Sequence, residues 1–407
     1  MTTPAAYHLH NSAHNRFYGS DHKFGILILA GLVLLIRKTD AFLNPQFWAE
    51  DFWPFFVDAN AIGEIIWYQY NGYHHLLPRI IAWVSAFCDP SFQPALYVFF
   101  SLGITLGVVL QVLSSRHDLR GKMWCALAVV TVPHTGEVFL NPTNLQWITA
   151  LALLITLFKK DPVSSADWAV DFLWLFFAGL TGPFSVLFFS LFLARAIYRR
   201  SVGSWLILCY LAVPASVQGW QIMHAVPITN STAFSWSKLI GVLSVRIPAT
   251  LGLGSKNSFK IGYLGAVTLG VLFSAAIVWS AIKKGISQEA RLFTLAAIVI
   301  TLAAAVLRMR LDTWAFDDIV NGDRYLFVPK ILCLWLIVYL IHETSSGWRQ
   351  RVVYGIVLCA ISMNLSSFRF KPYEDLNWTE YCPAIRAGKE IEIPINPGWK
   401  KIYPAKN

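Results

Sequence analysis

Long apolar runs recur along almost the whole chain, and they constrain its fold more than any other feature. An α-helix needs about 20 mainly apolar residues to cross a bilayer, and eleven runs approach this length. They lie at about 24–37, 94–113, 123–139, 145–158, 167–180, 184–198, 204–222, 261–282, 291–307, 325–341 and 352–368. Because backbone polar groups in lipid must be satisfied within each helix, the sequence predicts an all-α polytopic integral membrane protein with about 11 transmembrane helices.

The composition excludes a soluble enzyme and a nucleic-acid partner. Apolar residues make up 56% of the 407 positions and charged residues only 14%, against about 25% charged residues in soluble domains. A net charge of +10 would suggest nucleic acid as the partner of a soluble protein. Here the basic residues form short clusters between apolar runs, so we expect membrane lipid around the chain and no nucleic acid.

The short connectors between the runs predict the orientation. Lysine and arginine mark cytoplasmic connectors, and alternate connectors carry them: Arg116, Arg120 and Lys122; Lys159 and Lys160; Arg195, Arg199 and Arg200; Lys283, Lys284 and Arg291; Arg349 and Arg351. The short connectors around Asn141–Asn144 and Thr181–Pro183 carry none. We therefore expect a cytoplasmic N-terminus and, after an odd number of spans, a C-terminus in the periplasm of a bacterial inner membrane.

These boundaries divide the chain into a cytoplasmic lead (1–23), a transmembrane domain (24–368) and a periplasmic tail (369–407). The first apolar run is expected to be retained, because no small-residue cleavage site follows it. The larger loops, at about 38–93, 223–260 and 308–324, share the outer face with the tail and with most of the carboxylates. We expect the chemistry to take place on that face.

The first outer loop contains an acidic pair, Glu50 and Asp51, among aromatic residues. A partly desolvated carboxylate near the membrane surface has a raised pKa, which favours a role as general base. The alternative is a solvated helix N-cap formed by Asp51.

The stretch after the acids has the pattern of a helix that lies in the membrane interface. Apolar side chains recur at helical spacing, and three acids lie roughly opposite them. The apolar positions are Phe52, Phe55, Ala59, Ile62 and Ile66, and the acids are Asp51, Asp58 and Glu64.

A polar and aromatic patch follows, with Tyr70, Tyr73, His74 and His75 as candidates to line a sugar site. Arg79 is a candidate to hold a lipid phosphate by paired charge-assisted hydrogen bonds. The alternative for the histidines is hydrogen bonding in the interface. A metal site would need a third ligand at a recognisable spacing, and none is evident, so no cofactor is predicted and a divalent metal stays an open alternative.

Two further groups of polar residues are predicted near membrane depth, where such residues are functional candidates by default. Glu137 falls at the outer end of the third run, before Asn141, Asn144, Gln146 and Trp147; snorkelling to the interface is the alternative for Glu137. An acid-rich loop leads through Asp323, Arg324 and Tyr325 to Lys330, whose cation suits a phosphate. Capping and neutralising a helix start is the alternative for Asp323 and Arg324. Cys88 and Cys382 both fall outside, where a disulfide between them is one option.

These features resemble the GT-C glycosyltransferases that use polyprenyl-phosphate sugars: a retained first helix, an outer loop opening with Ala49-Glu50-Asp51, interfacial helices and many further spans. The nearer likeness is to bacterial and phage-borne glucosyltransferases that modify O-antigen. It covers most of the chain and rests on Tyr70-x-Gly-Tyr73-x-x-x-x-Pro78-Arg79, Asn141-x-x-Asn144-x-Gln146-Trp147, Gly322-Asp323-Arg324-Tyr325 and Pro394-x-Asn396-Pro397-Gly398-Trp399.

The resemblance implies transfer of a sugar, expected to be glucose, from undecaprenyl phosphate to a hydroxyl of a lipid-linked O-antigen or related glycan in the periplasm. Glu50 or Asp51 would be the base, and a single in-line displacement would invert the anomeric carbon. Arg79, Arg324 and Lys330 would stabilise the phosphate leaving group. Two alternatives stay open: a transporter or flippase of a lipid-linked or anionic substrate, suggested by Lys330 and Glu137, and an O-antigen polymerase.

Overall fold

The computed structural model of the chain describes residues 20–63, 66–225, 235–285, 287–308, 315–316, 318–343 and 347–405, and these residues are mostly helical. Each apolar run predicted from the sequence coincides with a helix. The helices are α2 (Ser20–Arg37), α5 (Gln93–Val112), α6 (Lys122–Thr131), α7 (Leu145–Phe158), α8 (Ser165–Gly179), α9 (Phe184–Arg199), α10 (Val202–His224), α13 (Gly262–Ile282), α14 (Gln288–Arg308), α15 (Phe327–Glu343) and α16 (Trp348–Leu365).

Five of the described helical segments are long and apolar enough to cross a membrane: Pro90–Val112, Val202–His224, Gly262–Ile282, Gln288–Arg308 and Asp323–His342. Shorter apolar helices include α6 and α7. The described residues thus form a helical protein compatible with a membrane, and the predicted count of eleven spans remains a prediction.

For the third apolar run, 123–139, the predicted end of the helix is wrong. Helix α6 stops at Thr131, because Val132 takes an extended conformation (ψ 134°) before Pro133. A residue before proline is driven out of the helical region by contact with the proline ring. Residues 132–144 therefore form an irregular loop, and Glu137 lies in that loop rather than in a helix.

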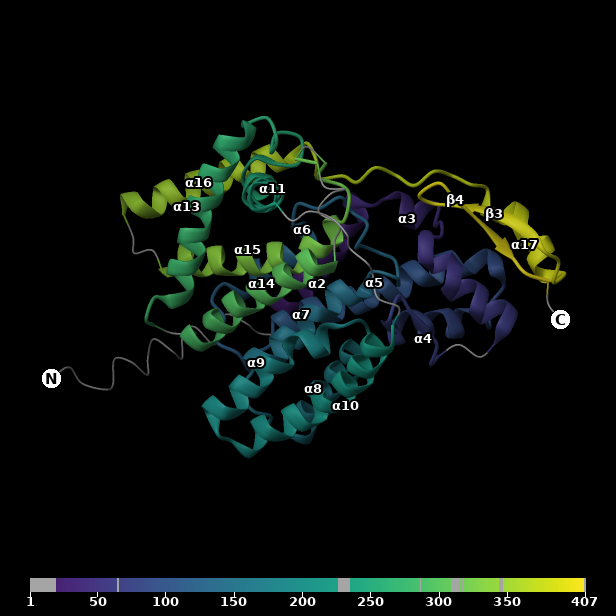
Figure 1. Cartoon of the computed structure of the whole chain (residues 1–407), viewed down its shortest axis with the longest axis horizontal. Helices are drawn as coiled ribbons and strands as arrows, with labels where there is room; N and C mark the ends of the chain where they lie inside the picture. Colours follow the sequence, from purple (N-terminus) through teal and green to yellow (C-terminus); the bar gives the residue numbers. More distant parts are fainter. Residues whose placement is uncertain are drawn as a thin grey trace.

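Helix α7 is the centre of the molecule, and all 14 of its residues are buried. It packs against α5, α8, α9 and α15. Helices α8, α9 and α10 pack together on one side, while α13, α14 and α15 form a second group (Figure 1). The short helices α11 (Trp236–Ser244), η5 (Val245–Ala249) and α12 (Thr250–Leu253) pack onto α13 or α16.

The segment between α2 and α5, predicted to be the first outer loop, folds into short elements rather than one long helix. They are α3 (Asp40–Leu43), η1 (Ala49–Asp51), η2 (Phe52–Phe56), η3 (Asp58–Ile62), the antiparallel strands β1 (Gln69–Tyr70) and β2 (Tyr73–His74), α4 (Leu76–Ser85) and η4 (Pro90–Phe92). Helix α4 packs on α5, η2 and η3, which ties the loop to the helical body.

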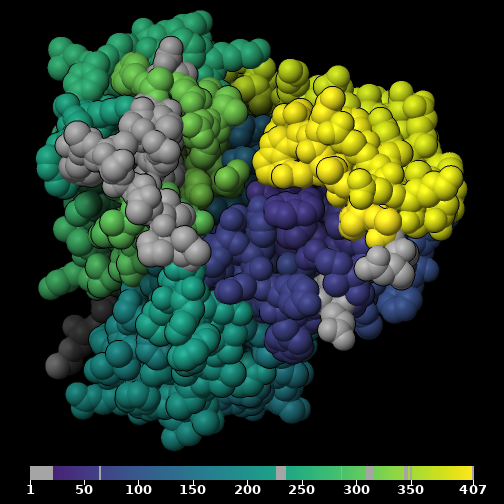
Figure 2. Space-filling model, turned by 45° about the vertical axis from the view of Figure 1, so that its right-hand side comes forward, coloured from purple at the N-terminus to yellow at the C-terminus, as the bar shows by residue number. Residues whose placement is uncertain are grey.

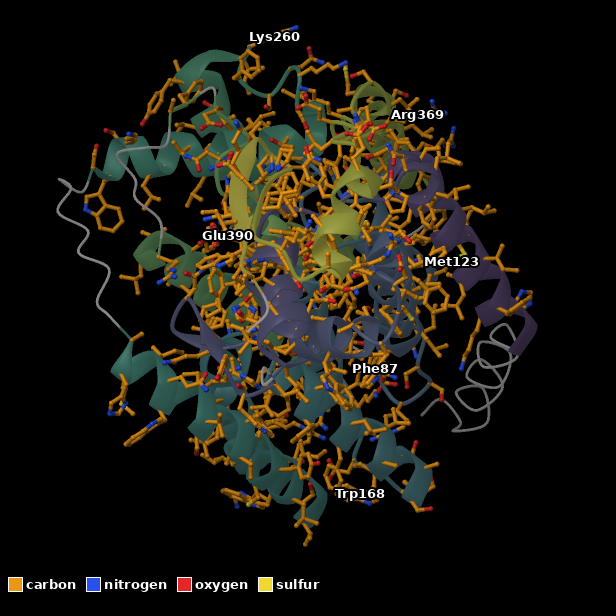
Figure 3. The ribbon with its side chains drawn as sticks, turned by 90° about the vertical axis from the view of Figure 1, so that its right-hand side faces the viewer. Phe87, Met123, Trp168, Lys260, Arg369 and Glu390 are labelled. Atoms are coloured by element: carbon orange, nitrogen blue, oxygen red, sulfur yellow. The ribbon has the colours of Figure 1, made fainter. Side chains whose placement is uncertain are left out.

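The tail covers this loop. It forms α17 (Trp378–Arg386) and the hairpin of β3 (Ile391–Ile395) and β4 (Trp399–Tyr403), and Figure 2 shows it seated against the first-loop residues. The Trp378 ring packs edge-on against Phe47 and Phe56, and its indole N–H donates to the Pro90 carbonyl at 2.9 Å. In Figure 3 the tail, with Glu390, faces the viewer, and Trp168 and Lys260 mark opposite ends of the molecule.

The disulfide considered between Cys88 and Cys382 is not formed. Both cysteines are free; Cys88 is exposed, whereas Cys382 is buried and its thiol lies 3.5 Å from the Trp378 carbonyl in its own helix.

Arg37, the last residue of α2, joins three segments, and its loss should destabilise the fold. Its guanidinium is buried and donates to the carbonyls of Val130 (2.5 Å), Val132 (3.0 Å) and Phe368 (3.1 Å). Arg37→Met leaves these carbonyls, two of them at the end of α6, without that donor. We expect a loss of about 1–3 kcal/mol, seen as a lower melting temperature of the detergent-solubilised protein. Arg369→Met, at an exposed position, is the control, and equal shifts for both variants would contradict the prediction.

Candidate functional site

The acidic pair lies in η1, and the backbone just before it is strained. Ala49 has a φ of 37°, a conformation that non-glycine residues rarely adopt and that often accompanies functional sites. The tail holds it there, because the Ala49 N–H donates to the Asn396 carbonyl at 2.6 Å. The Asn396 side chain in turn exchanges hydrogen bonds of 3.0 Å with the Glu374 backbone.

The predicted interfacial helix differs from the observed structure in one important respect. Phe52 and Phe55 are fully buried, but Ile62 is 55% exposed, and Asp51 is only 2% exposed. Asp51 therefore points into the protein, not onto a solvated polar face. Helical periodicity could not reveal this, because the partner of Asp51 lies far along the chain. Glu64 lies outside the described residues.

Asp51 is bound by Thr143, in the loop before α7. Its Oδ1 accepts hydrogen bonds from the Thr143 backbone N–H (2.9 Å) and hydroxyl (2.7 Å). The capping alternative is wrong, since Asp51 makes no side-chain cap on η2. Burial raises the pKa of Asp51 to about 7, although the two Thr143 hydrogen bonds oppose the shift. A carboxyl with a pKa near 7 can exchange a proton at physiological pH.

This raised pKa makes stability depend on pH. The unfolded carboxyl loses its proton near pH 3.8 and the folded one near pH 7, so the folded state holds more protons between these values and loses stability as pH rises. We expect the melting temperature of the wild type to fall relative to that of Asp51→Asn from pH 4 to pH 7, and the difference to level off above about pH 8. Glu390→Gln, at an exposed position, is the control. Parallel curves for wild type and Asp51→Asn would contradict the shift.

Glu137 and Arg324 form an ion pair beside the acids. The Arg324 backbone N–H donates to Glu137 Oε1 at 3.0 Å, and Nη1 donates to Oε2 at 3.2 Å. Asn141 and Asn144 are buried, and their side-chain amides donate to the Glu137 carbonyl (2.5 and 2.8 Å). These asparagines shape the loop that presents Glu137, while the Arg324 side chain stays 37% exposed.

An aromatic group surrounds this ion pair. Trp147, in the first turn of α7, packs edge-on against Tyr325, with 5.2 Å between ring centroids. Gln146 is buried in the same turn of α7, and the Tyr73 ring centroid lies 4.6 Å from that of His75. The structure thus brings together predicted residues from three separate segments.

Lys330, the buried cation predicted to bind a phosphate, is paired with a carboxylate in the structure. Its Nζ donates to Asp323 Oδ1 at 2.7 Å and to the Pro133 carbonyl at 3.2 Å. Asp323 also accepts from the Thr135 N–H at 2.9 Å and lies 3.4 Å from the His134 ring nitrogen. Asp323 is the first residue of η7 (Asp323–Leu326), whose N-cap is Gly322, and its carboxylate accepts from Thr135 and Lys330 rather than capping that helix. Arg324 is the more available cation.

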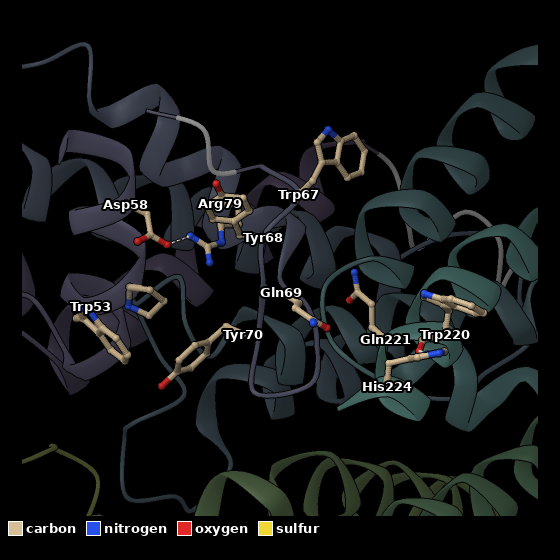
Figure 4. Close-up of a pocket in the computed structure, with 11 residues that line it drawn as sticks. Trp53, Asp58, Trp67, Tyr68, Gln69, Tyr70, Arg79, Trp220, Gln221 and His224 are labelled. Carbon is tan, nitrogen blue, oxygen red and sulfur yellow. Dashed lines mark hydrogen bonds and ion pairs between the residues drawn. The ribbon is translucent and has the colours of Figure 1, made fainter. Parts of the chain in front are cut away.

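Arg79 and Asp58 form the third group, at the side of an open cavity of about 640 Å³. Arg79 is buried, donates to Asp58 Oδ2 at 2.5 Å and lies over the Phe55 ring. The cavity lies between η2, β1 and the end of α10 (Figure 4). Tyr70 lines it, whereas His74 and His75 do not. Burial lowers the pKa of His74 to about 4 and that of His75 to about 3, so both rings are neutral at pH 7.

Tyr70 connects the cavity to the acids. Burial and then the nearby Glu50 carboxylate raise the pKa of Tyr70 to about 12, and Glu50 also interacts electrostatically with Arg324. Glu50 is partly exposed, unlike Asp51. Glu50 is therefore the more accessible acid of the pair, within electrostatic range of Tyr70 on the cavity wall and of the Arg324 cation.

Sequence reasoning missed several residues of this site. Lys38 donates to the Phe139 carbonyl (2.9 Å) and the Tyr373 hydroxyl (2.6 Å), and its charge interacts with Asp51 and Glu137. Its position directly after the first apolar run was a usable signal. The sequence carries no such signal for Thr143 and Tyr373, because a threonine in a loop and a tyrosine in the tail are both common.

Among the described residues, no group of three His, Cys, Asp or Glu side chains is placed to hold a metal ion. In comparisons with known proteins, the chain matches no family model, no curated protein and no solved structure.

Proposed function

We propose that the protein is a polytopic inner-membrane glycosyltransferase of the GT-C type. It would move a sugar, expected to be glucose, from undecaprenyl phosphate to a hydroxyl of a lipid-linked O-antigen or related glycan on the periplasmic face. One observation supports this best: Glu50, a partly exposed acid, interacts with both Tyr70 on the cavity wall and the Arg324 cation. A base and a cation at one site are what an inverting transfer to a hydroxyl requires.

The reaction uses each group once. Glu50 takes the proton of the acceptor hydroxyl as that oxygen bonds to the anomeric carbon. The bond from the anomeric carbon to the phosphate oxygen breaks, and its electron pair leaves with undecaprenyl phosphate. Arg324, whose side chain is 37% exposed, stabilises the added negative charge.

Neighbouring groups position these two. Thr143 and buried Asp51 fix the turn that carries Glu50, and Glu137 orients Arg324 by two contacts. Arg79 and Lys330 are each paired with an aspartate, which makes them supports of the site rather than the main phosphate ligands.

The test is a mass comparison of lipopolysaccharide from cells with and without the protein, with the Glu50→Gln/Asp51→Asn double variant alongside. We expect one added hexose per repeat, lost in a double variant that is still inserted in the membrane. An unchanged repeat mass would contradict the proposal. Substrate flux in proteoliposomes without a covalent product would then favour a carrier, and longer glycan chains would favour a polymerase.

A further inference from the structure

The cavity beside the acidic pair has a lining of unusual composition. It begins at Trp53, two residues after Asp51, and continues through Trp67 and Tyr68 to Trp220 at the end of α10 (Figure 4). Its volume of about 640 Å³ falls within the range of ligand pockets, about 300–1,000 Å³. Trp67 and Trp220 are 69% and 63% exposed. One side of each ring packs on a histidine, with 5.6 Å between the centroids of Trp67 and His74 and 4.0 Å between those of Trp220 and His224, which leaves the opposite face for a ligand.

The polar part of the lining has little net charge and offers hydrogen bonds. The charge of Arg79 is balanced by Asp58, 2.5 Å away, so the site does not select an anion. Gln69 and Gln221 supply amides. Arg79 Nε and Gln221 Oε1 are buried and have no hydrogen-bond partner among the described residues. Buried polar atoms are nearly always paired, so these two point to a ligand that supplies the missing partners.

The lining also argues against a lipid chain. Of the described residues that line the cavity, none is leucine, isoleucine, valine, methionine or alanine. An acyl or isoprenoid chain would favour such aliphatic walls, whereas these walls alternate aromatic rings with amides and an ion pair. Aromatic faces accept the C–H face of a pyranose, and amides accept and donate to its hydroxyls.

We propose that this cavity binds a neutral saccharide chain, with Trp220 as a stacking surface and Gln221 as a hydrogen-bonding group. Only the identity of that chain as the acceptor rests on the proposed function. The saccharide would then run from the cavity past Tyr70 to Glu50, so that the residue to be modified reaches the base.

Binding can be measured apart from transfer. The full-length protein in nanodiscs is titrated with two lipid-free glycans, maltoheptaose and the polysaccharide released by mild acid from the lipopolysaccharide of the producing strain. Calorimetry follows wild type, Trp220→Ala, Gln221→Leu and Trp205→Ala. Trp205 lies on the same helix, 43% exposed and outside the cavity, so it controls for loss of an exposed tryptophan from α10.

We expect saturable binding of at least one glycan, weakened about tenfold or more by Trp220→Ala and by Gln221→Leu, and unchanged by Trp205→Ala. Absence of saturable binding to both glycans, or equal losses for Trp205→Ala and Trp220→Ala, would overturn the proposal; the latter would mean that both tryptophans serve as membrane-interface anchors. Glycan binding without sugar transfer would refute the proposed function but support the saccharide site. Sugar transfer without glycan binding would support the proposed function but refute the saccharide site.

Discussion

Glu50→Gln is expected to lower the rate of sugar transfer about 10²–10⁴-fold, the usual contribution of a general base. The glutamine amide keeps the size of the side chain but cannot take a proton from the acceptor hydroxyl. Because Glu50 is only partly buried, the melting temperature should change little. The measurement is the initial rate of hexose transfer by membranes that contain equal amounts of each variant, supplied with undecaprenyl-phosphate sugar and lipid-linked glycan.

The variants Asp51→Asn and Thr143→Val test whether Asp51 and Thr143 only position Glu50 or whether Asp51 is itself the base. Asparagine keeps an Oδ1 that can accept both Thr143 hydrogen bonds, so we expect a smaller loss than for Glu50→Gln. Thr143→Val removes the hydroxyl donor alone and should likewise reduce the rate only in part. If Glu50→Gln stays active while Asp51→Asn is inactive, the base is Asp51; if both remain fully active, the acidic pair has no role in catalysis.

Asp323→Asn is expected to cause the largest loss of stability. It leaves the Lys330 ammonium, 2% exposed and 2.7 Å from the lost charge, buried without its anion. Breaking one side of a buried ion pair costs about 3–5 kcal/mol. We expect a strong fall in folded protein, measured as the monodisperse fraction after detergent extraction and as the melting temperature of what remains.

The double variant Asp323→Asn/Lys330→Met is the informative companion, because it removes both charges. We expect it to recover a clear part of the stability lost in the single variant. Asp118→Asn breaks the exposed pair with Lys160, whose side chain is 67% exposed, and should change little, as surface pairs usually contribute little. A single variant no less stable than Asp118→Asn would contradict the predicted burial of the Lys330 charge.

The positions of the helices followed from the sequence because hydropathy over about 20 residues is a local property. The runs at 204–222, 261–282 and 291–307 correspond closely to α10, α13 and α14. The helix predicted over 123–139 is too long: Pro133 ends α6 early, and His134, Thr135, Gly136 and Glu137 follow before the next apolar residues. The number of membrane crossings is harder to predict, since several of these helices are shorter than a bilayer is thick.

The candidate site was predictable in its members but not in their partners. Acids, arginines and aromatic residues clustered in apolar surroundings are rare enough to stand out in a sequence. Their pairing depends on which segments meet in space. Asp51 bonds to Thr143 across 92 positions, and Arg324 bonds to Glu137 across 187. A pattern of neighbouring residues cannot predict contacts between positions so far apart in the sequence.

The sequence by itself determined the helical class, the loop that carries Glu50 and Asp51, and the polar residues placed among apolar ones, because each depends on side chains close together along the chain. Tertiary structure alone decided that Asp51 is buried, that Lys330 is neutralised by Asp323, and that Trp53 and Trp220 line one cavity. The physical reason is that burial, ion pairing and cavity shape arise from long-range packing, in which each side chain responds to partners that lie far away in the sequence.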